Sequence, residues 1–206
     1  MNGKQYAFSS WSDGGKRTHD VTNTGNKTFT AMFVDVTNTS KAGIALAPTA
    51  DAYVADGPDA GANFGKAKNL EIKANASVGK NRVAFLTFDI SSLGKTFGSA
   101  LLRVFGSNAG SDVVDTAVYG VSNTSWSEMG INFNNQPALD STPQSSVEVT
   151  DSIGRWYEFE LTKYVLAAMS KGKTKVSLAL MLPIGGSVDQ FNSREASGNK
   201  PQLFVS

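Results

Sequence analysis

A near-continuous apolar stretch lies near the middle of the chain, in the segment NRVAFLTFDIS at residues 81–91. Apolar and aromatic residues follow one another there instead of alternating with polar ones, which predicts a strand buried on both faces. The cation Arg82 precedes this run, and the acid Asp89 stands near its end. We expect Asp89 to end the strand as an Asx-type turn residue, whereas Arg82 could serve either the fold or a ligand.

Strand patterns recur from residue 44 to the end of the chain at intervals of about 8–12 residues, a spacing typical of β-sandwiches. The segments between them are rich in Gly, Asn and Ser, as turns are. The expected strands cover residues 44–47, 70–73, 82–90, 99–106, 113–121, 145–150, 155–161, 175–182 and 201–206. This arrangement predicts an all-β fold of the sandwich type.

One segment, TKYVLAAMSKG at residues 162–172, departs from the strand pattern because its apolar residues recur at helical spacing. Thr162 suits the N-cap position and Gly172 suits the first position beyond the C-terminus. We expect one short helix, inserted between two strands of the sandwich.

The first 40 residues carry the pattern of a β-hairpin. Aromatic and small residues alternate in the segments 4–11 and 27–36, and the sequence SDGG after the first has turn chemistry. A lone hairpin is marginally stable in water. This part resembles the terminal strands of small β-sandwich repeats in large bacterial exported proteins. We interpret residues 1–40 as the tail of an upstream β-domain and residues 41–206 as a separate module.

Composition narrows the classes of function. The 206 residues include no cysteine, so disulfides and thiolate chemistry are excluded, and the net charge of +1 gives no global attraction to nucleic acid or membranes. No apolar window is long enough to span a bilayer. The first residues lack the features of a signal peptide. The chain could therefore be a cytoplasmic protein or an interior piece of a longer exported chain. We favour the second interpretation, which implies a secreted or cell-surface location.

An ordered set of motifs covers residues 44 to 206. They are DAYVAD (51–56), NFG (63–65), NRVAFLTFDIS (81–91), SALLRV (99–104), SWSE and NFNNQPA (125–138), WYEFELTKYV (156–165) and FNSREASGNKPQLFV (191–205). This set resembles the DNRLRE-type domain, also classed as carbohydrate-binding module family 96. Two positions depart from the family pattern, Asp56 in place of glutamate and Phe133 in place of tryptophan. The resemblance implies a jelly-roll-like antiparallel β-sandwich that binds polysaccharide and is often appended to lyases or hydrolases of uronate-rich polymers.

Cationic and amide side chains gather around two neighbouring predicted strands and recur in a later one. Lys73 is on the outward phase of its strand, and Arg103 is opposite in phase to its apolar neighbours. Sugar carboxylates favour charge-assisted, often bidentate bonds to such groups. The candidate carbohydrate-binding residues are Lys66, Lys68, Lys73, Asn81, Arg82, Arg103 and Arg194. The alternative is a solvated face in which Arg82 pairs with an acid such as Asp89 or Glu195, and Arg194 with Glu195.

A second candidate site is a calcium-binding loop. Asp51, Asp56, Asp59 and Asn63 supply hard oxygen ligands near a Gly-Pro turn, and calcium accepts such ligands in irregular geometry. The EF-hand frame is absent. The alternative is that these side chains only cap turns.

Three hypotheses of function follow. The first is a non-catalytic module, monomeric within a multidomain chain, that binds an acidic polysaccharide such as alginate and targets a linked enzyme. The second is a polysaccharide lyase; the single histidine, His19, lies outside the predicted sandwich and counts against it. The third is a structural surface module with calcium and no glycan affinity. Trp126 and Trp156 are expected in core or edge positions instead of a sugar-stacking role.

Overall fold

The computed structural model describes residues 6–14, 20–22, 25–35, 43–110, 113–150 and 152–206. The chain divides into two compact units, Met1–Gly43 and Ile44–Ser206. In the first unit, β1 (Tyr6–Trp11) and β2 (Ala31–Asp35) pair antiparallel, which confirms the expected N-terminal hairpin. His19 lies outside the described residues.

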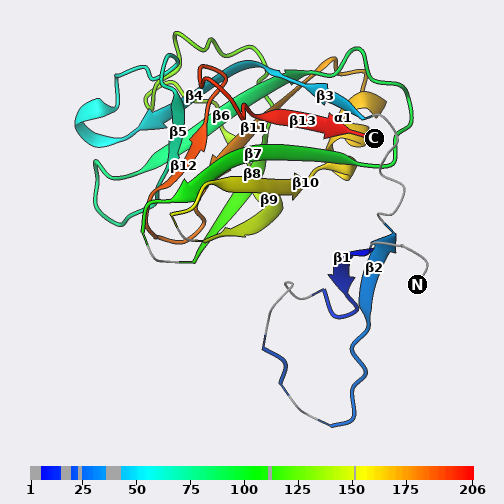
Figure 1. Cartoon of the computed structure of the whole chain (residues 1–206). Coiled ribbons are helices and arrows are strands. Elements are labelled where there is room, and N and C mark those ends of the chain that lie inside the picture. The colour runs from blue at the N-terminus through cyan, green and yellow to red at the C-terminus, as the bar shows by residue number, and fades with distance from the viewer. Residues whose placement is uncertain (1–5, 15–19, 23–24, 36–42, 111–112, 151) are drawn as a thin grey trace. The chain divides into compact units, whose positions relative to one another are not determined.

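The second unit is a jelly-roll-like antiparallel β-sandwich, as predicted, and Figure 1 shows its strands with their labels. One sheet has the order β4-β6-β11-β8-β9. Its strands are β4 (Pro48–Ala55), β6 (Arg82–Asp89), β11 (Lys175–Met181), β8 (Val114–Val121) and β9 (Leu139–Val149). A short 3-10 turn, η1 (Gly57–Asp59), follows β4.

The other sheet has six strands in the order β3-β13-β7-β12-β5, and β10 pairs with the free side of β7. Its strands are β3 (Ile44–Leu46), β13 (Gln202–Val205), β7 (Ala100–Asn108), β12 (Asp189–Asn192), β5 (Asn69–Ile72) and β10 (Arg155–Glu160). Strand β12 was not predicted, because its sequence DQFN offers a single apolar residue. Strand β9 begins earlier than predicted and includes Pro143, beside which its register with β8 shifts.

The main core lies between the two sheets. Leu102 and Val104 of β7 and Leu86 and Phe88 of β6 are fully buried in it. A second, smaller core covers the opposite face of the five-stranded sheet and contains Phe85. Strand β6 is therefore buried on both faces, as its near-continuous apolar run predicted.

The described residues contain one α-helix, α1 (Thr162–Ser170), at the predicted place. Thr162 does not cap it: the N-cap is Leu161, and the Thr162 hydroxyl accepts a hydrogen bond from the Ala100 N–H at 2.8 Å. Gly172 does follow the C-cap in the left-handed region, with φ +69, as predicted. Within the described residues, no helix has both the length and the apolar character needed to cross a bilayer.

Candidate functional site

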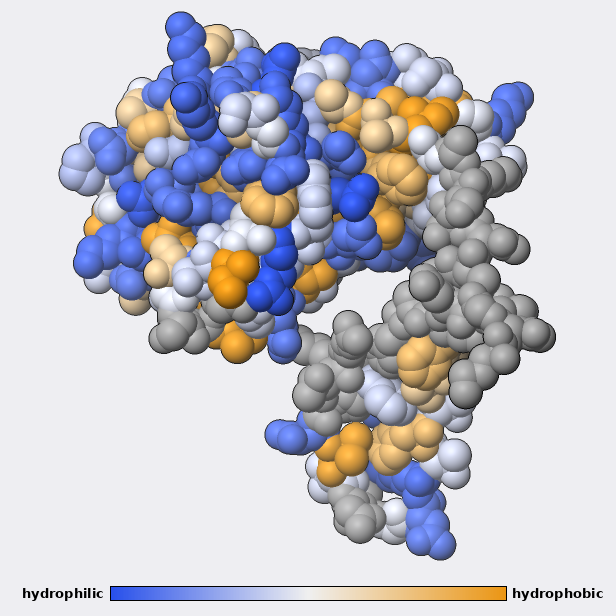
Figure 2. Space-filling model, viewed as in Figure 1, coloured by the Kyte–Doolittle hydropathy of each residue, from blue (hydrophilic) through white to orange (hydrophobic). Residues whose placement is uncertain are grey.

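The outward-facing side of the six-stranded sheet, here called the outer face, collects polar and aromatic side chains. In β7, the buried Leu102 and Val104 alternate with the half-buried Arg103 and Phe105, so these last two point away from the core. The same alternation in the other strands completes the set. The outer face comprises Asn69, Glu71, Leu101, Arg103, Phe105, Ser107, Trp156, Glu158, Glu160, Gln190, Asn192, Gln202 and Phe204. Figure 2 shows that hydrophilic residues predominate on the side of the second unit in view and that hydrophobic residues form smaller groups among them.

Arg103 lies in the middle of the outer face. Strand register places Gln202 on one side of it and Glu158 on the other. Its Nε donates to Glu158 Oε1 at 2.9 Å, and its guanidinium carbon lies 5.0 Å from the Trp156 ring centre and 5.6 Å from that of Phe204. These cation–π contacts hold the guanidinium in a defined position over the sheet. Only one of the five N–H donors of Arg103 is engaged by Glu158.

Lys73 and Arg82 meet at one end of this face. Their backbones exchange two hydrogen bonds, of 3.1 and 2.8 Å, so their side chains leave the same side of the ladder. Arg82 Nε lies 2.9 Å from Glu71 Oε2, so the two side chains form an ion pair. The N–H bond of Arg82 Nε does not point at this oxygen, and the contact is therefore not a hydrogen bond. Glu71 Oε1 accepts from Gln190 at 3.2 Å. Burial, and then the Glu71 charge, raise the pKa of the neighbouring Tyr53.

The remaining predicted residues have different surroundings. The Asn81 side chain donates to Asp56 Oδ2 at 2.7 Å and accepts from the Asn75 N–H at 2.8 Å, so it braces the ends of the strands. Lys66 and Lys68 are exposed in the loop that leads into β5. In the part of the chain that the structure describes, Lys66, Lys68 and Lys73 form no ion pair.

The three predicted arginines are each paired with a carboxylate. Arg82 pairs with Glu71 and Arg103 with Glu158, while Arg194 pairs with Glu128. The acid beside Arg82 is therefore neither Asp89 nor Glu195, the two that the sequence suggested. Asp89 accepts from the Ser91 N–H at 2.8 Å, which is the expected turn contact. Uncompensated positive charge thus comes from the lysines instead of the arginines.

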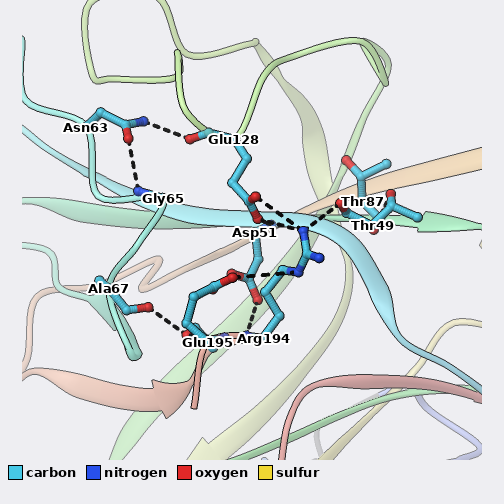
Figure 3. A network of polar contacts seen from close by, with 10 residues as sticks. Thr49, Asp51, Asn63, Gly65, Ala67, Thr87, Glu128, Arg194 and Glu195 are labelled. Atoms are coloured by element: carbon cyan, nitrogen blue, oxygen red, sulfur yellow. Dashed lines mark hydrogen bonds and ion pairs between the residues drawn. The ribbon is translucent and has the colours of Figure 1, made fainter.

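A separate group, the carboxylate cluster, is formed by Asp51, Glu128 and Glu195 (Figure 3). One carboxylate oxygen of each lies within 4.8 Å of the others. Arg194 Nη1 donates to both oxygens of Glu128, at 3.1 and 3.2 Å, and to the Thr49 carbonyl at 2.8 Å. The Arg194 backbone N–H donates to Asp51 Oδ2 at 2.8 Å. Arg194 therefore belongs to this cluster and not to the group around Arg103.

Asp51 is 1% exposed, and this burial raises its pKa from the ordinary 3.8 to about 7. The hydrogen bond from the Arg194 backbone opposes the shift, and the nearby Glu195 and Glu128 charges add to it. Asp51 Oδ1 and Glu195 Oε2 are buried without a hydrogen-bond partner. Glu195 thus combines a buried, unpartnered oxygen with a 3.7 Å ion pair to Arg194 Nε, the pair expected in this turn.

The expected calcium ligand set does not come together. Asp51, Asp56 and Asp59 form no cluster of neighbouring carboxylates among the described residues. The cause is strand geometry: Asp51 and Asp56 are an odd number of residues apart, so they leave opposite faces of the extended chain. Asn63 serves the loop instead, because its amide donates to the Glu128 and Ile131 carbonyls at 2.8 and 2.7 Å.

The aromatic residues of the outer face were missed by sequence reasoning. Trp126 packs against the second core and donates to Ser177 Oγ at 2.8 Å, as a core residue would. Trp156 is half-buried on the outer face of β10, edge to face with Phe105 at 5.6 Å between ring centres. The alternation of WYEFE, with Tyr157 and Phe159 inward, already placed Trp156 outward. The residues beside Trp156 on this face, Phe105 of β7 and Phe204 of β13, could not be identified from the sequence, because they depend on which strands pair.

Comparison with known proteins gives a family for the second unit. A gellan lyase from Bacillus sp is 29% identical over 171 residues, which cover 79% of this chain and 7% of that protein. The chain therefore spans only a small fraction of the length of that relative. Residues 42–206 match the family model of carbohydrate-binding module family 96. With most of its length matched by that model, the chain belongs to carbohydrate-binding module family 96.

Proposed function

We propose that the sandwich binds a polysaccharide chain along the outer face of its six-stranded sheet. The observation that carries this proposal is the set of side chains gathered there. Trp156, Phe105 and Phe204 offer apolar ring surface for sugar C–H groups, and amides such as Gln190 and Gln202 offer donors and acceptors for hydroxyls. Side chains on paired strands are held rigidly, which reduces the entropy lost on binding.

The ligand class we propose is an acidic polymer, alginate or another polyuronate. Among the described residues no acid pairs with Lys73, which lies beside Arg82 at one end of the face. Near the centre of the face, only one of the five N–H donors of Arg103 forms a hydrogen bond with another described residue. Charge-assisted bonds from such groups are the strongest that a protein offers to a sugar carboxylate.

The proposed role is to hold a linked enzyme, a lyase or a glycoside hydrolase, near its substrate. A tether converts encounter with the polymer into an intramolecular event, which raises the effective concentration without any catalysis by the module. The likeness to part of a gellan lyase supports this arrangement. A linked enzyme that degrades polysaccharides would act outside the cell, so we propose a secreted or surface-attached location.

Affinity electrophoresis tests the proposal. The intact chain is run through gels that contain alginate, pectin, gellan, xylan or cellulose derivatives, with an unrelated non-binding protein as the reference. We expect retardation in the acidic polymers, weakened by added salt because charged contacts are screened. Unretarded migration in every polymer would overturn the proposal and would favour a purely structural module.

Matched variants locate the binding surface. Replacing Lys73 with alanine, or Arg103 and Trp156 together, should reduce retardation in the acidic polymer about tenfold or more, since each charge-assisted bond contributes about 1.5–3 kcal/mol. Lys163→Ala is the control, because Lys163 is exposed on α1 and lies in neither sheet. Equal losses in the Lys73 and Lys163 variants would contradict binding at the outer face.

A lyase on this scaffold is the competing function. A surface pocket beside α1 is lined by Asp140, Tyr164, Lys171 and Lys173 among others. Tyr164 is poorly suited as a base there, because burial raises its pKa and its hydroxyl donates to the Ser177 carbonyl at 3.0 Å. We expect no release of unsaturated products when the chain is incubated with a polyuronate.

A further inference from the structure

The carboxylate cluster carries a surplus of negative charge. Asp51, Glu128 and Glu195 face a single guanidinium, that of Arg194, so two negative charges remain uncompensated when all three acids are ionised. The side chains of Glu128 and Glu195 are only 20% and 29% exposed, and Asp51 is buried. Uncompensated charge in such surroundings is costly, so the cluster must take up either a cation or a proton.

Two buried carboxylate oxygens without a hydrogen-bond partner among the described residues indicate where a cation could bind. Asp51 Oδ1 and Glu195 Oε2 are buried and have no hydrogen-bond partner, whereas the second Asp51 oxygen accepts from the Arg194 backbone. Buried polar atoms are almost always paired in folded proteins. Both unpartnered atoms belong to acids of one cluster, whose ligand oxygens lie within 4.8 Å of one another.

The size and chemistry of the cluster match calcium. Calcium binds oxygens at about 2.3–2.6 Å, so oxygens up to about 5 Å apart can share one ion, and the three ligand oxygens lie within 4.8 Å of one another. Magnesium demands shorter bonds and near-ideal octahedral geometry. The set contains only carboxylate oxygens, which suit hard cations better than zinc or copper.

We propose that Asp51, Glu128 and Glu195 bind one calcium ion, with water completing the coordination. Arg194 lowers the surplus charge to that of a divalent cation and orients Glu128 through its two hydrogen bonds. The ion ties together three segments that are distant in the sequence: strand β4, the loop that follows β8, and the turn after β12. Its role is to stabilise the edge of the sandwich, independently of glycan binding.

Thermal unfolding of the intact chain tests the site. After treatment with EDTA and removal of the chelator, calcium chloride is titrated in while the Tm is recorded. We expect the Tm to rise by about 5–10 °C at about a hundred times the Kd, and to go on rising with the logarithm of the calcium concentration. Isothermal titration of the same sample should show one calcium site per chain, and magnesium should produce a smaller shift. An unchanged Tm together with no heat of calcium binding would overturn the proposal.

Two variants assign the site to the cluster. Asp51→Asn can still accept the Arg194 N–H but loses the free carboxylate oxygen, so the calcium response should disappear. Glu148→Gln removes an exposed acid on β9 and should respond as the original chain does. If Asp51→Asn fails to fold, calcium titration of Glu195→Gln makes the same test. A full calcium response in either cluster variant would contradict the assignment, and a proton shared by Asp51 and Glu195 would then explain the unpartnered oxygens.

Discussion

Glu71 controls how much positive charge one end of the outer face presents. It pairs with Arg82 at 2.9 Å and accepts from Gln190, so a polymer carboxylate must compete with it for the arginine. Both side chains of the ion pair are only 26% exposed and Arg82 Nε is buried, so removing one partner leaves the other charge poorly solvated and also costs folding stability. Glu71 therefore affects both ligand binding and the stability of the fold.

Glu71→Gln is predicted to bind an acidic polysaccharide about two- to fivefold more tightly, because removing one nearby negative charge is worth about 0.5–1 kcal/mol. The glutamine can still accept from Gln190. Binding is measured by isothermal titration with a polyuronate oligosaccharide. Glu148→Gln, which makes the same change in net charge on the other sheet, should bind as the original chain does. Weaker binding by Glu71→Gln would show that Arg82 does not face the ligand.

Strand β12 joins the two sheets through one buried acid. Asp189 accepts from Asn108 of β7 at 2.8 Å and, through its other oxygen, from the Thr116 hydroxyl of β8. The three residues are fully buried. Burial raises the pKa of Asp189 from 3.8 to about 6, although the hydrogen bonds from Thr116 and Asn108 oppose the shift. The folded chain therefore holds this proton more tightly than the unfolded chain does.

The free energy of unfolding should consequently rise as the pH is lowered from about 6 towards 4, as far as Asp189 contributes. Asp189→Asn cannot titrate and should lose this part of the pH dependence while keeping a hydrogen-bonding side chain. Urea unfolding of both chains at several pH values, with calcium saturating, measures the difference. Parallel pH profiles for the two chains would show that Asp189 remains ionised in the fold.

The second unit contains all of the core that the described residues show, and its fold could largely be predicted. The alternation in strands such as β7 predicted the sandwich, and the near-continuous apolar run of β6 predicted a strand buried on both faces. The phase of Lys73 and Arg103 also placed them outward. The acid partners of Arg82 and Arg103 could not be predicted, because Glu71 and Glu158 reach the two arginines only through the pairing of strands.

The ligands of the proposed calcium site could not be predicted from the sequence either, because the fold brings them together from distant parts of the chain. Asp51 was identified from the sequence, but the other two acids of the cluster come from residues 77 and 144 positions further along the chain. The ligands expected from the sequence, Asp51, Asp56, Asp59 and Asn63, are close together along the chain but do not form a cluster in the structure. The odd separation of Asp51 and Asp56 was already a reason to doubt that pair.

Binding of a chain-like ligand across one whole sheet is the central claim, and mapping by NMR tests it most directly. Backbone amide shifts of the intact chain are recorded while a polyuronate oligosaccharide is added. We predict that the perturbed amides lie in β5, β7, β10, β12 and β13, with the indole N–H of Trp156 among the shifted signals. Perturbations confined to α1 and the five-stranded sheet, or none at saturating oligosaccharide, would contradict the claim.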